Sequence, residues 1–201
     1  MSDENALGDL TTGGKVLPIT RWGTPVMHAQ TRRVTEFGEE LHQLIRDMWA
    51  TMHAAEGVGL AATQVGVDLA VFVYECPDAD HVTHRGVFVN PEVILPEGNE
   101  RNLEAADEGC LSHPGGYATL ARADVATCVG QDAYGNPQEK IGTGYLARCL
   151  QHETDHLNGT VFGDRLSKRS RRQLDKQVAE LAFRYPDDWP VSPKTVAKPV
   201  A

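Results

Sequence analysis

A short stretch at residues 149–159, CLQHETDHLNG, holds two histidines at the spacing His-Glu-x-x-His. On a helix this spacing places His152 and His156 on one face, one turn apart, where both imidazoles can bind the same metal ion. A catalytic metal site takes three protein ligands, so one more must come from elsewhere in the chain. The identity of that ligand separates a zinc endopeptidase from other metal-dependent hydrolases.

Downstream of the motif, two positions compete for the role of third ligand. The extended signature H-E-x-x-H-x-x-G-x-x-H is matched through Gly159, but Phe162 stands where its last histidine belongs, and phenylalanine cannot bind a metal. Glu180 lies on a later charged segment and could complete the site of a metalloendopeptidase. Its surroundings are more typical of a solvated surface carboxylate.

Upstream of the motif, the segment EGCLS at residues 108–112 offers the thiol of Cys110 beside a flexible glycine. A thiol that binds a cation ionises, because the cation stabilises the thiolate. A lone cysteine is usually a small buried apolar residue. The vacant ligand position nevertheless favours Cys110 as the third ligand.

A glycine-rich segment, GVGLAATQ at residues 57–64, matches the loose dinucleotide-binding pattern G-x-G-x-x-A. That pattern requires a strand before it and a helix after it, whereas this chain has the reverse order. The segment is therefore interpreted as a loop whose backbone approaches a ligand closely, with Gln64 as an amide donor.

The three segments GVGLAATQ, EGCLS and QHETDHLNG resemble, in this order and with these separations, the signature motifs of the peptide deformylase family. The resemblance extends loosely from about Lys15 to about Leu181. It implies three metal ligands, which are Cys110, His152 and His156. It also implies Glu153 as the catalytic acid and base, and oxyanion donors in the Gln64 amide and the backbone N–H of Leu111. Glu153 is turned about 100° from His152 on a helix, which suits a place beside a bound water rather than on the metal.

Further residues are implied by the same resemblance. A pocket for the methionine side chain of the substrate would be formed by Gly59, Leu60, Tyr145, Arg148 and Cys149. A charge pair between Glu108 and Arg122 would brace the cysteine loop without touching the metal. Family members usually have an aliphatic residue at the position of His113, and many have an arginine at that of Tyr117. These departures, together with Gly115-Gly116, concern contacts to the peptide, and His113 is expected to be an exposed loop residue.

The implied activity is removal of the formyl group from the N-terminal formylmethionine of newly synthesised polypeptides, with release of formate. The implied cofactor is one divalent metal ion, Fe2+ in the cell, with Zn2+, Ni2+ or Co2+ as alternatives. Two other functions stay open at this point: the metalloendopeptidase with Glu180 as third ligand, and a non-catalytic module whose metal only supports the fold. The latter needs a fourth protein ligand, such as His113.

The sequence pattern around these residues predicts the helices and strands that position them. Together they indicate an α+β fold, with small strands and sheets packed around a central helix that carries the HExxH motif. A C-terminal helix follows from about Ser170. Apolar spacing predicts a first helix over residues 35–55, and strand-like runs cover 69–75, 86–97 and 123–135. We expect a single catalytic domain at residues 1–185, with a flexible lead at 1–14, and a proline-rich loose tail at 186–201.

Composition limits the partners. The net charge of -9 and the pI near 5.3 argue against sequence-specific nucleic-acid binding. No secretory signal or membrane span is evident and the four cysteines are far apart, which predicts a cytoplasmic protein with free thiols.

Residues 165–176, RLSKRSRRQLDK, carry six Lys or Arg against one Asp. This basic cluster is interpreted either as a solvated helix face or as a transient contact with the ribosome.

Overall fold

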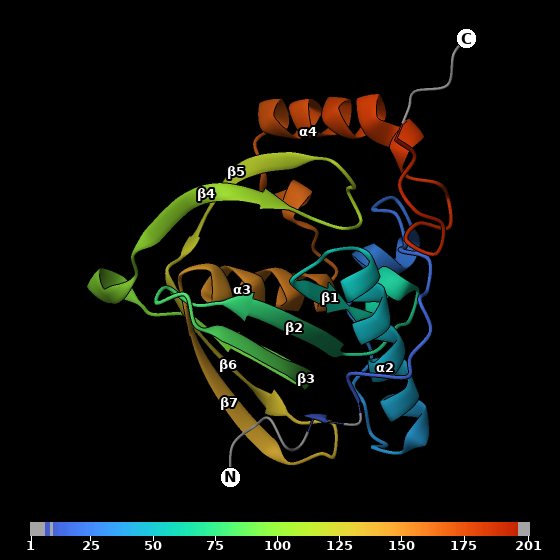
Figure 1. Cartoon of the computed structure of the whole chain (residues 1–201). Coiled ribbons are helices and arrows are strands. Elements are labelled where there is room, and N and C mark those ends of the chain that lie inside the picture. Colours follow the sequence, from blue (N-terminus) through green and yellow to red (C-terminus); the bar gives the residue numbers. More distant parts are fainter. Residues whose placement is uncertain (1–6, 9, 197–201) are drawn as a thin grey trace.

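The computed structural model describes residues 7–8 and 10–196, and an antiparallel sheet of five strands lies at its centre (Figure 1). The strand order is β1-β2-β3-β6-β7. The five strands are β1 (Gly59–Ala61), β2 (Val71–Pro77), β3 (Thr83–Ile94), β6 (Val125–Gln131) and β7 (Pro137–Thr143).

Strand β2 shows why this sheet has a helix on each side. Its side chains alternate, so that Val71 and Val73 face one core and Phe72 and Tyr74 face another. The first core is covered by helix α2 (Glu39–Ala54), and the second by helix α3 (Gly144–Leu157). Both faces of the strand are therefore buried, which fits its nearly continuous apolar sequence.

The central helix α3 carries the HExxH motif, and all of its residues from Leu146 to Leu157 are buried. It lies between the large sheet and a separate hairpin of two strands, β4 (Leu103–Gly109) and β5 (Tyr117–Ala123) (Figure 1). The predicted α+β fold around a central helix is confirmed.

Helix α4 (Lys168–Leu181) packs on the outer side of the hairpin, at the loop between its strands. A Cβ atom at Gly116 would lie 2.5 Å from Leu174 and 2.7 Å from Val178 of α4. At Gly115, where φ is +80°, a Cβ would lie 2.9 Å from Leu181. The glycine pair is therefore required for close approach of α4 to this loop.

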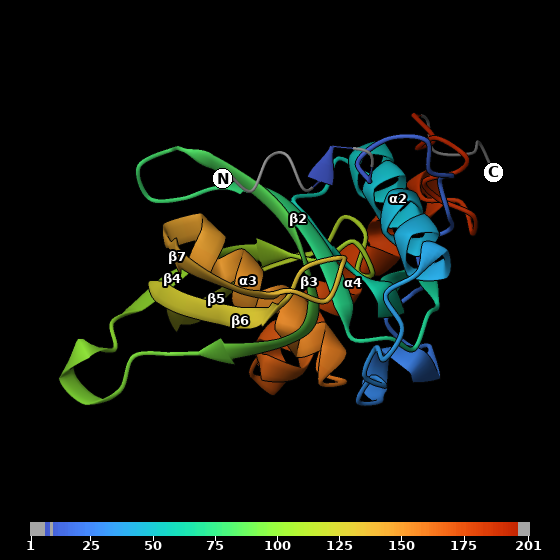
Figure 2. The same cartoon turned by 90° about the horizontal axis from the view of Figure 1, so that it is seen from below.

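The prediction of a loose tail from residue 186 is wrong for residues 186–196. Trp189 is only 2% exposed, and its carbonyl accepts a hydrogen bond from the N–H of Ile19 at 2.8 Å. Burial of the large aromatic side chain helps to offset the chain entropy that the ordered segment loses. Figure 2 shows this part of the chain at the same end of the molecule as α2.

The predicted flexible lead is also partly wrong, since Leu7 and Leu10 are buried in the core beneath α2. Residues 1–6, 9 and 197–201, which belong to the predicted lead and tail, lie outside the described residues. The first predicted helix begins at Glu39 rather than near residue 35, and α4 begins at Lys168, after the N-cap Ser167, rather than at about Ser170. Within the described residues, no helix combines the length and the apolar character that a membrane span requires.

Candidate metal centre

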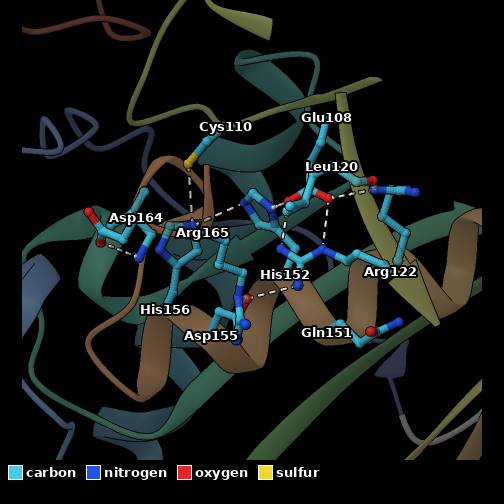
Figure 3. A network of polar contacts seen from close by, with 12 residues as sticks. Glu108, Cys110, Leu120, Arg122, Gln151, His152, Asp155, His156, Asp164 and Arg165 are labelled. Atoms are coloured by element: carbon cyan, nitrogen blue, oxygen red, sulfur yellow. Dashed lines mark hydrogen bonds and ion pairs between the residues drawn. The ribbon is translucent and has the colours of Figure 1, made fainter. Parts of the chain in front are cut away.

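Three side chains from two elements converge beneath the hairpin (Figure 3). His152 and His156 lie one turn apart on α3, and Cys110 follows the end of β4. The Nε2 atom of His156 is 3.2 Å from Nε2 of His152 and 3.3 Å from the sulfur of Cys110. All three donor atoms lie within 4.8 Å of one another, and all three residues are buried. One thiol and two imidazoles at this separation form a donor set that could hold a transition-metal ion.

Glu108 fixes the orientation of His152. Its Oε1 atom is 2.7 Å from Nδ1 of the ring, and its two oxygens accept hydrogen bonds of 2.6 and 2.8 Å from Arg122. Burial opposes ionisation of the Glu108 carboxyl, but the hydrogen bonds from Arg122 and His152 outweigh it and hold the pKa well below its ordinary value. An ionised carboxylate only accepts, so Nδ1 must carry the proton. The lone pair of Nε2 is then left for the site.

The polar network continues from Arg122 to Asp155, which sequence reasoning missed (Figure 3). Nη1 of Arg122 donates to Asp155 Oδ2 at 2.8 Å, and Arg165 donates to the same oxygen at 2.6 Å. Asp155 lies between the two histidines in sequence, and its position on α3 turns it away from them toward the two arginines. Its place inside the motif was the only sequence signal for this role.

Arg148 lies in the pocket wall, where the resemblance placed it. Its guanidinium donates to Glu108 Oε2 and to the carbonyls of Leu120 and Glu104, each at 2.9 Å. The charged end is thereby used within the protein, because a buried guanidinium requires hydrogen-bond acceptors. Arg148 is thus also a further contact of the Glu108 network, while its role toward the methionine side chain stays a prediction.

Glu153 lies on the other side of the candidate centre, against Gly59 of β1. Its side chain is 4% exposed, and Oε2 has no hydrogen-bond partner among the described residues. Burial raises the pKa of this carboxyl to about 7. A Cβ atom at Gly59 would collide with Glu153 Oε1 and lie 2.8 Å from its carboxyl carbon. Glycine at residue 59 is therefore what leaves room for the carboxylate.

Gln64 has a defined amide orientation. The backbone N–H of Ala61 donates to Oε1 at 2.9 Å, which identifies that atom as the oxygen. The NH2 group then points to the sulfur of Cys110 at 3.6 Å and to Ser112 Oγ at 3.4 Å. The amide thus faces the same centre as the thiol.

A pocket of about 230 Å³ opens above these groups. Residues from all three sequence motifs border it, and they include Gly59, Gln64, Glu108, Cys110, Leu111, Cys149, His152 and Glu153. Tyr145, at 47% exposure, stands at its rim. Leu60 does not line the pocket, contrary to the prediction. Side chains alternate along β1, so Leu60 points into the core under α2 while Gly59 faces the pocket.

The comparison with known proteins agrees with this geometry. A family model described as polypeptide deformylase matches residues 16–172. The chain belongs to the polypeptide deformylase family. It is 54% identical over 173 residues to peptide deformylase 1 of Streptomyces avermitilis, covering 86% of this chain and 80% of that protein. It is 48% identical over 170 residues to peptide deformylase 2 of Streptomyces coelicolor, covering 85% of this chain and 93% of that protein.

Solved deformylase structures share the fold. The peptide deformylase of Legionella pneumophila superposes with a TM-score of 0.74 at 38% identity, over 85% of this chain and 99% of its own. That of Synechococcus elongatus in complex with actinonin gives a TM-score of 0.71 at 36% identity, over 85% and 92%.

His113 of this deformylase family member is buried at 3% exposure, not exposed in a loop as predicted. Its ring packs between Trp22 and Phe162, with centroid distances of 5.3 and 5.4 Å. Burial lowers the pKa of the imidazole to about 4, which favours the neutral form. His113 is not part of the convergent group of donors, so the fourth ligand that a purely structural metal site would need does not come from it.

The endopeptidase alternative required Glu180 at the metal. The Glu180 side chain is 63% exposed and pairs with Lys176 at 3.7 Å on the surface of α4. A helix with a solvated outer face explains this placement, as does the charged sequence around it. The side chain that lies beside the two histidines is instead the Cys110 thiol.

The pocket has one wall that sequence reasoning missed entirely. Tyr185, Trp189 and Lys194 line it from a part of the chain that follows α4. This stretch carries none of the deformylase motifs, and the family match ends at residue 172. The only sequence signal for this wall was a large aromatic residue, Trp189, in a proline-rich stretch.

Proposed function

We propose that this protein is a metal-dependent amidase that removes the formyl group from N-terminal formylmethionine of newly synthesised polypeptides and releases formate. The observation that carries the proposal is the convergence of Cys110, His152 and His156 on one point, with the unpaired carboxylate of Glu153 beside it in the pocket. Membership of the deformylase family supports the same reaction.

The residues at the centre fit a bound divalent cation. Two imidazole nitrogens and a sulfur lie close together while Glu108 holds the proton of His152 on the far side of the ring. Cys110, His152 and His156 would hold the ion, and the mixed nitrogen and sulfur donors suit Fe2+, Zn2+, Co2+ or Ni2+. We infer Fe2+ in the cell. When bound, such a cation supplies Lewis acidity and lowers the pKa of a water toward about 7 in catalytic zinc sites.

Glu153 would move the proton of the reaction. Its carboxylate can accept a proton from the attacking water and later deliver it to the leaving nitrogen. The water oxygen adds to the formyl carbon, the carbon–nitrogen bond breaks, and the amine takes the proton as formate leaves. The fixed position of the carboxylate against Gly59 supports this role, since a proton carrier must lie within hydrogen-bond reach of both partners.

The Gln64 amide and the backbone N–H of Leu111 would stabilise charge on the formyl oxygen. The amide is held by Ala61 before any substrate binds, so no reorganisation is needed. Loss of one such donor typically costs about 3 kcal/mol of barrier. Gly59, Tyr145 and Cys149 line the same pocket and would contact the methionine side chain.

The basic cluster at residues 165–176 would contact the ribosome with fewer charges than its sequence suggests. Arg165 pairs with Asp155, and Arg171 pairs with Asp164 and stacks on Trp22. Within the described residues, Lys168, Arg169 and Arg172 make no ion pair and point outward.

We infer a cytoplasmic location, supported by four free cysteines, and a catalytic domain that includes the residues up to 196.

The test is a formate-release assay on protein purified without oxygen, with its metal content measured on the same sample. Formyl-Met-Ala-Ser should give formate and a free amine, while acetyl-Met-Ala-Ser and an internally cleavable blocked peptide should give no product. Cleavage of the blocked peptide, or metal-loaded protein that releases no formate, would contradict the proposal.

A further inference from the structure

The part of the chain after α4 forms a fixed wall of the pocket. We call residues 185–195 the C-terminal segment. Arg21 donates from Nη2 to the carbonyls of Tyr185 at 3.1 Å and Pro186 at 2.8 Å, and Thr195 N–H donates to the carbonyl of Arg184. The rings of Tyr185 and Trp189 meet edge to face, with centroids 5.1 Å apart. These contacts hold the segment in place along most of its length.

One ion pair joins the C-terminal segment to Glu56, the residue before the glycine-rich segment 57–64. Lys194 Nζ donates to Glu56 Oε2 at 2.7 Å, and both residues line the pocket. Glu56 follows α2 and has a φ of +58°, a left-handed conformation that is rare outside glycine. Glu56 directly precedes the glycine-rich segment at residues 57–64, and Glu56, Gly57 and Gly59 all line the pocket that the substrate would enter.

These two side chains are the charges that a peptide would meet first. The other charged groups in the pocket wall are buried, and Glu108 and Arg148 neutralise each other through a 2.9 Å contact. The Glu56 side chain is 79% exposed and that of Lys194 is 32% exposed. Charges that reach solvent act over about 8 to 10 Å at ordinary salt, which covers the residues after the methionine.

We propose that Glu56 and Lys194 determine how the enzyme responds to charge in the residues that follow formylmethionine. The proposal rests on the deformylase function proposed above. Paired, the two groups leave the mouth of the pocket without net charge, so acidic and basic peptides are accepted alike. Removal of either partner leaves one charge uncompensated and creates a preference for the opposite sign.

The test compares three substrates as C-terminal amides: formyl-Met-Ala-Glu, formyl-Met-Ala-Lys and the neutral formyl-Met-Ala-Ser. Lys194→Met should lower the ratio of kcat/KM for the glutamate peptide over the lysine peptide about fivefold at low salt, as expected for one charge a few ångströms away. Glu56→Gln should raise the ratio by a similar factor. The exchanged double variant, Glu56→Lys with Lys194→Glu, should return it toward the original value.

Matched controls come from another exposed ion pair of the chain. Lys176→Met and Glu180→Gln change the same net charge on the outer face of α4, and the ratio should stay constant. A ratio that stays within twofold in both Lys194→Met and Glu56→Gln, while formyl-Met-Ala-Ser is hydrolysed normally, would overturn the proposal. Failure of the unchanged protein to release formate from any of the three peptides would overturn the deformylase function itself.

Discussion

The floor and the C-terminal wall of the pocket are built in different ways. The floor takes two donors from a single turn of α3 and a third from the loop after β4, and Glu108 joins the two elements. The wall takes Tyr185, Trp189 and Lys194 from a segment without regular structure that returns to α2. Short sequence motifs identify the residues of the floor, whereas the residues of the wall belong to no motif. The residues proposed to carry the chemistry can therefore be predicted from this sequence, whereas most of those proposed to contact the peptide cannot.

The largest effect is expected from a substitution of Glu153, which lies in the floor of the pocket. Glu153→Gln should lower kcat by about 1000-fold, since general acid and base catalysis typically contributes 100- to 10000-fold. Metal content should be unchanged, because the carboxylate is not among the three convergent donors. Formate release and elemental analysis on one sample measure both; a variant with near-normal turnover would refute the assigned role.

The wall is tested next by Trp189→Ala. Removal of this buried ring should cost about 3 to 5 kcal/mol of unfolding free energy, as is typical of large-to-alanine changes in a core. Chemical denaturation measures the loss. Val191→Ala, in the same segment but 50% exposed, should change stability by less than about 0.5 kcal/mol. Equal, small effects of both variants would mean that the segment is as loose as its composition suggests.

Arg148→Met tests a residue that lies in the pocket wall and also contacts Glu108. Loss of its contact with Glu108 should cost about 3 kcal/mol of stability and weaken metal binding about 10- to 100-fold. Thermal unfolding and competition with a chelator measure these effects. If Arg148 instead contacted the methionine side chain, KM would rise while metal affinity and stability stayed constant.

Gly59→Ala has the smallest expected effect of this set. The added Cβ should displace the Glu153 carboxylate and lower kcat by up to about 100-fold, a typical result of misplacing a catalytic group by about 1 Å. Gly23→Ala is the control, because a Cβ there meets nothing within 4 Å. Unchanged turnover in Gly59→Ala would show that the carboxylate position is not critical.

The residues of the floor could be predicted because they lie within short motifs. The HExxH spacing and the apolar neighbours of α3 were enough to identify a buried central helix, and the EGCLS segment supplied the thiol. Leu60 was assigned to the pocket wrongly, since the direction of each side chain along β1 depends on its pairing with β2. His113 was expected in solvent, but Trp22 and Phe162, both distant in sequence, enclose it.

The wall could not be predicted because its sequence resembles that of a disordered tail. Prolines and polar residues surround Trp189. Only the hydrogen bonds of Ile19 to the Trp189 carbonyl and of Arg21 to the Pro186 carbonyl show that the chain returns to the body of the protein. The role of Gly115 and Gly116 was equally hidden. Their missing side chains matter only once α4 is known to pack against that loop.

The two strands of the β4–β5 hairpin pair only with each other in the described part of the chain, and not with the five-stranded sheet. Glu108 and Cys110 both lie at one end of it. If the hairpin lifts away by a local unfolding event, Cys110 and Glu108 leave the candidate metal centre together, while the large sheet stays folded. A cation bound at this centre would stabilise the closed hairpin, so scarcity of the ion would expose the hairpin to proteases before the rest of the protein.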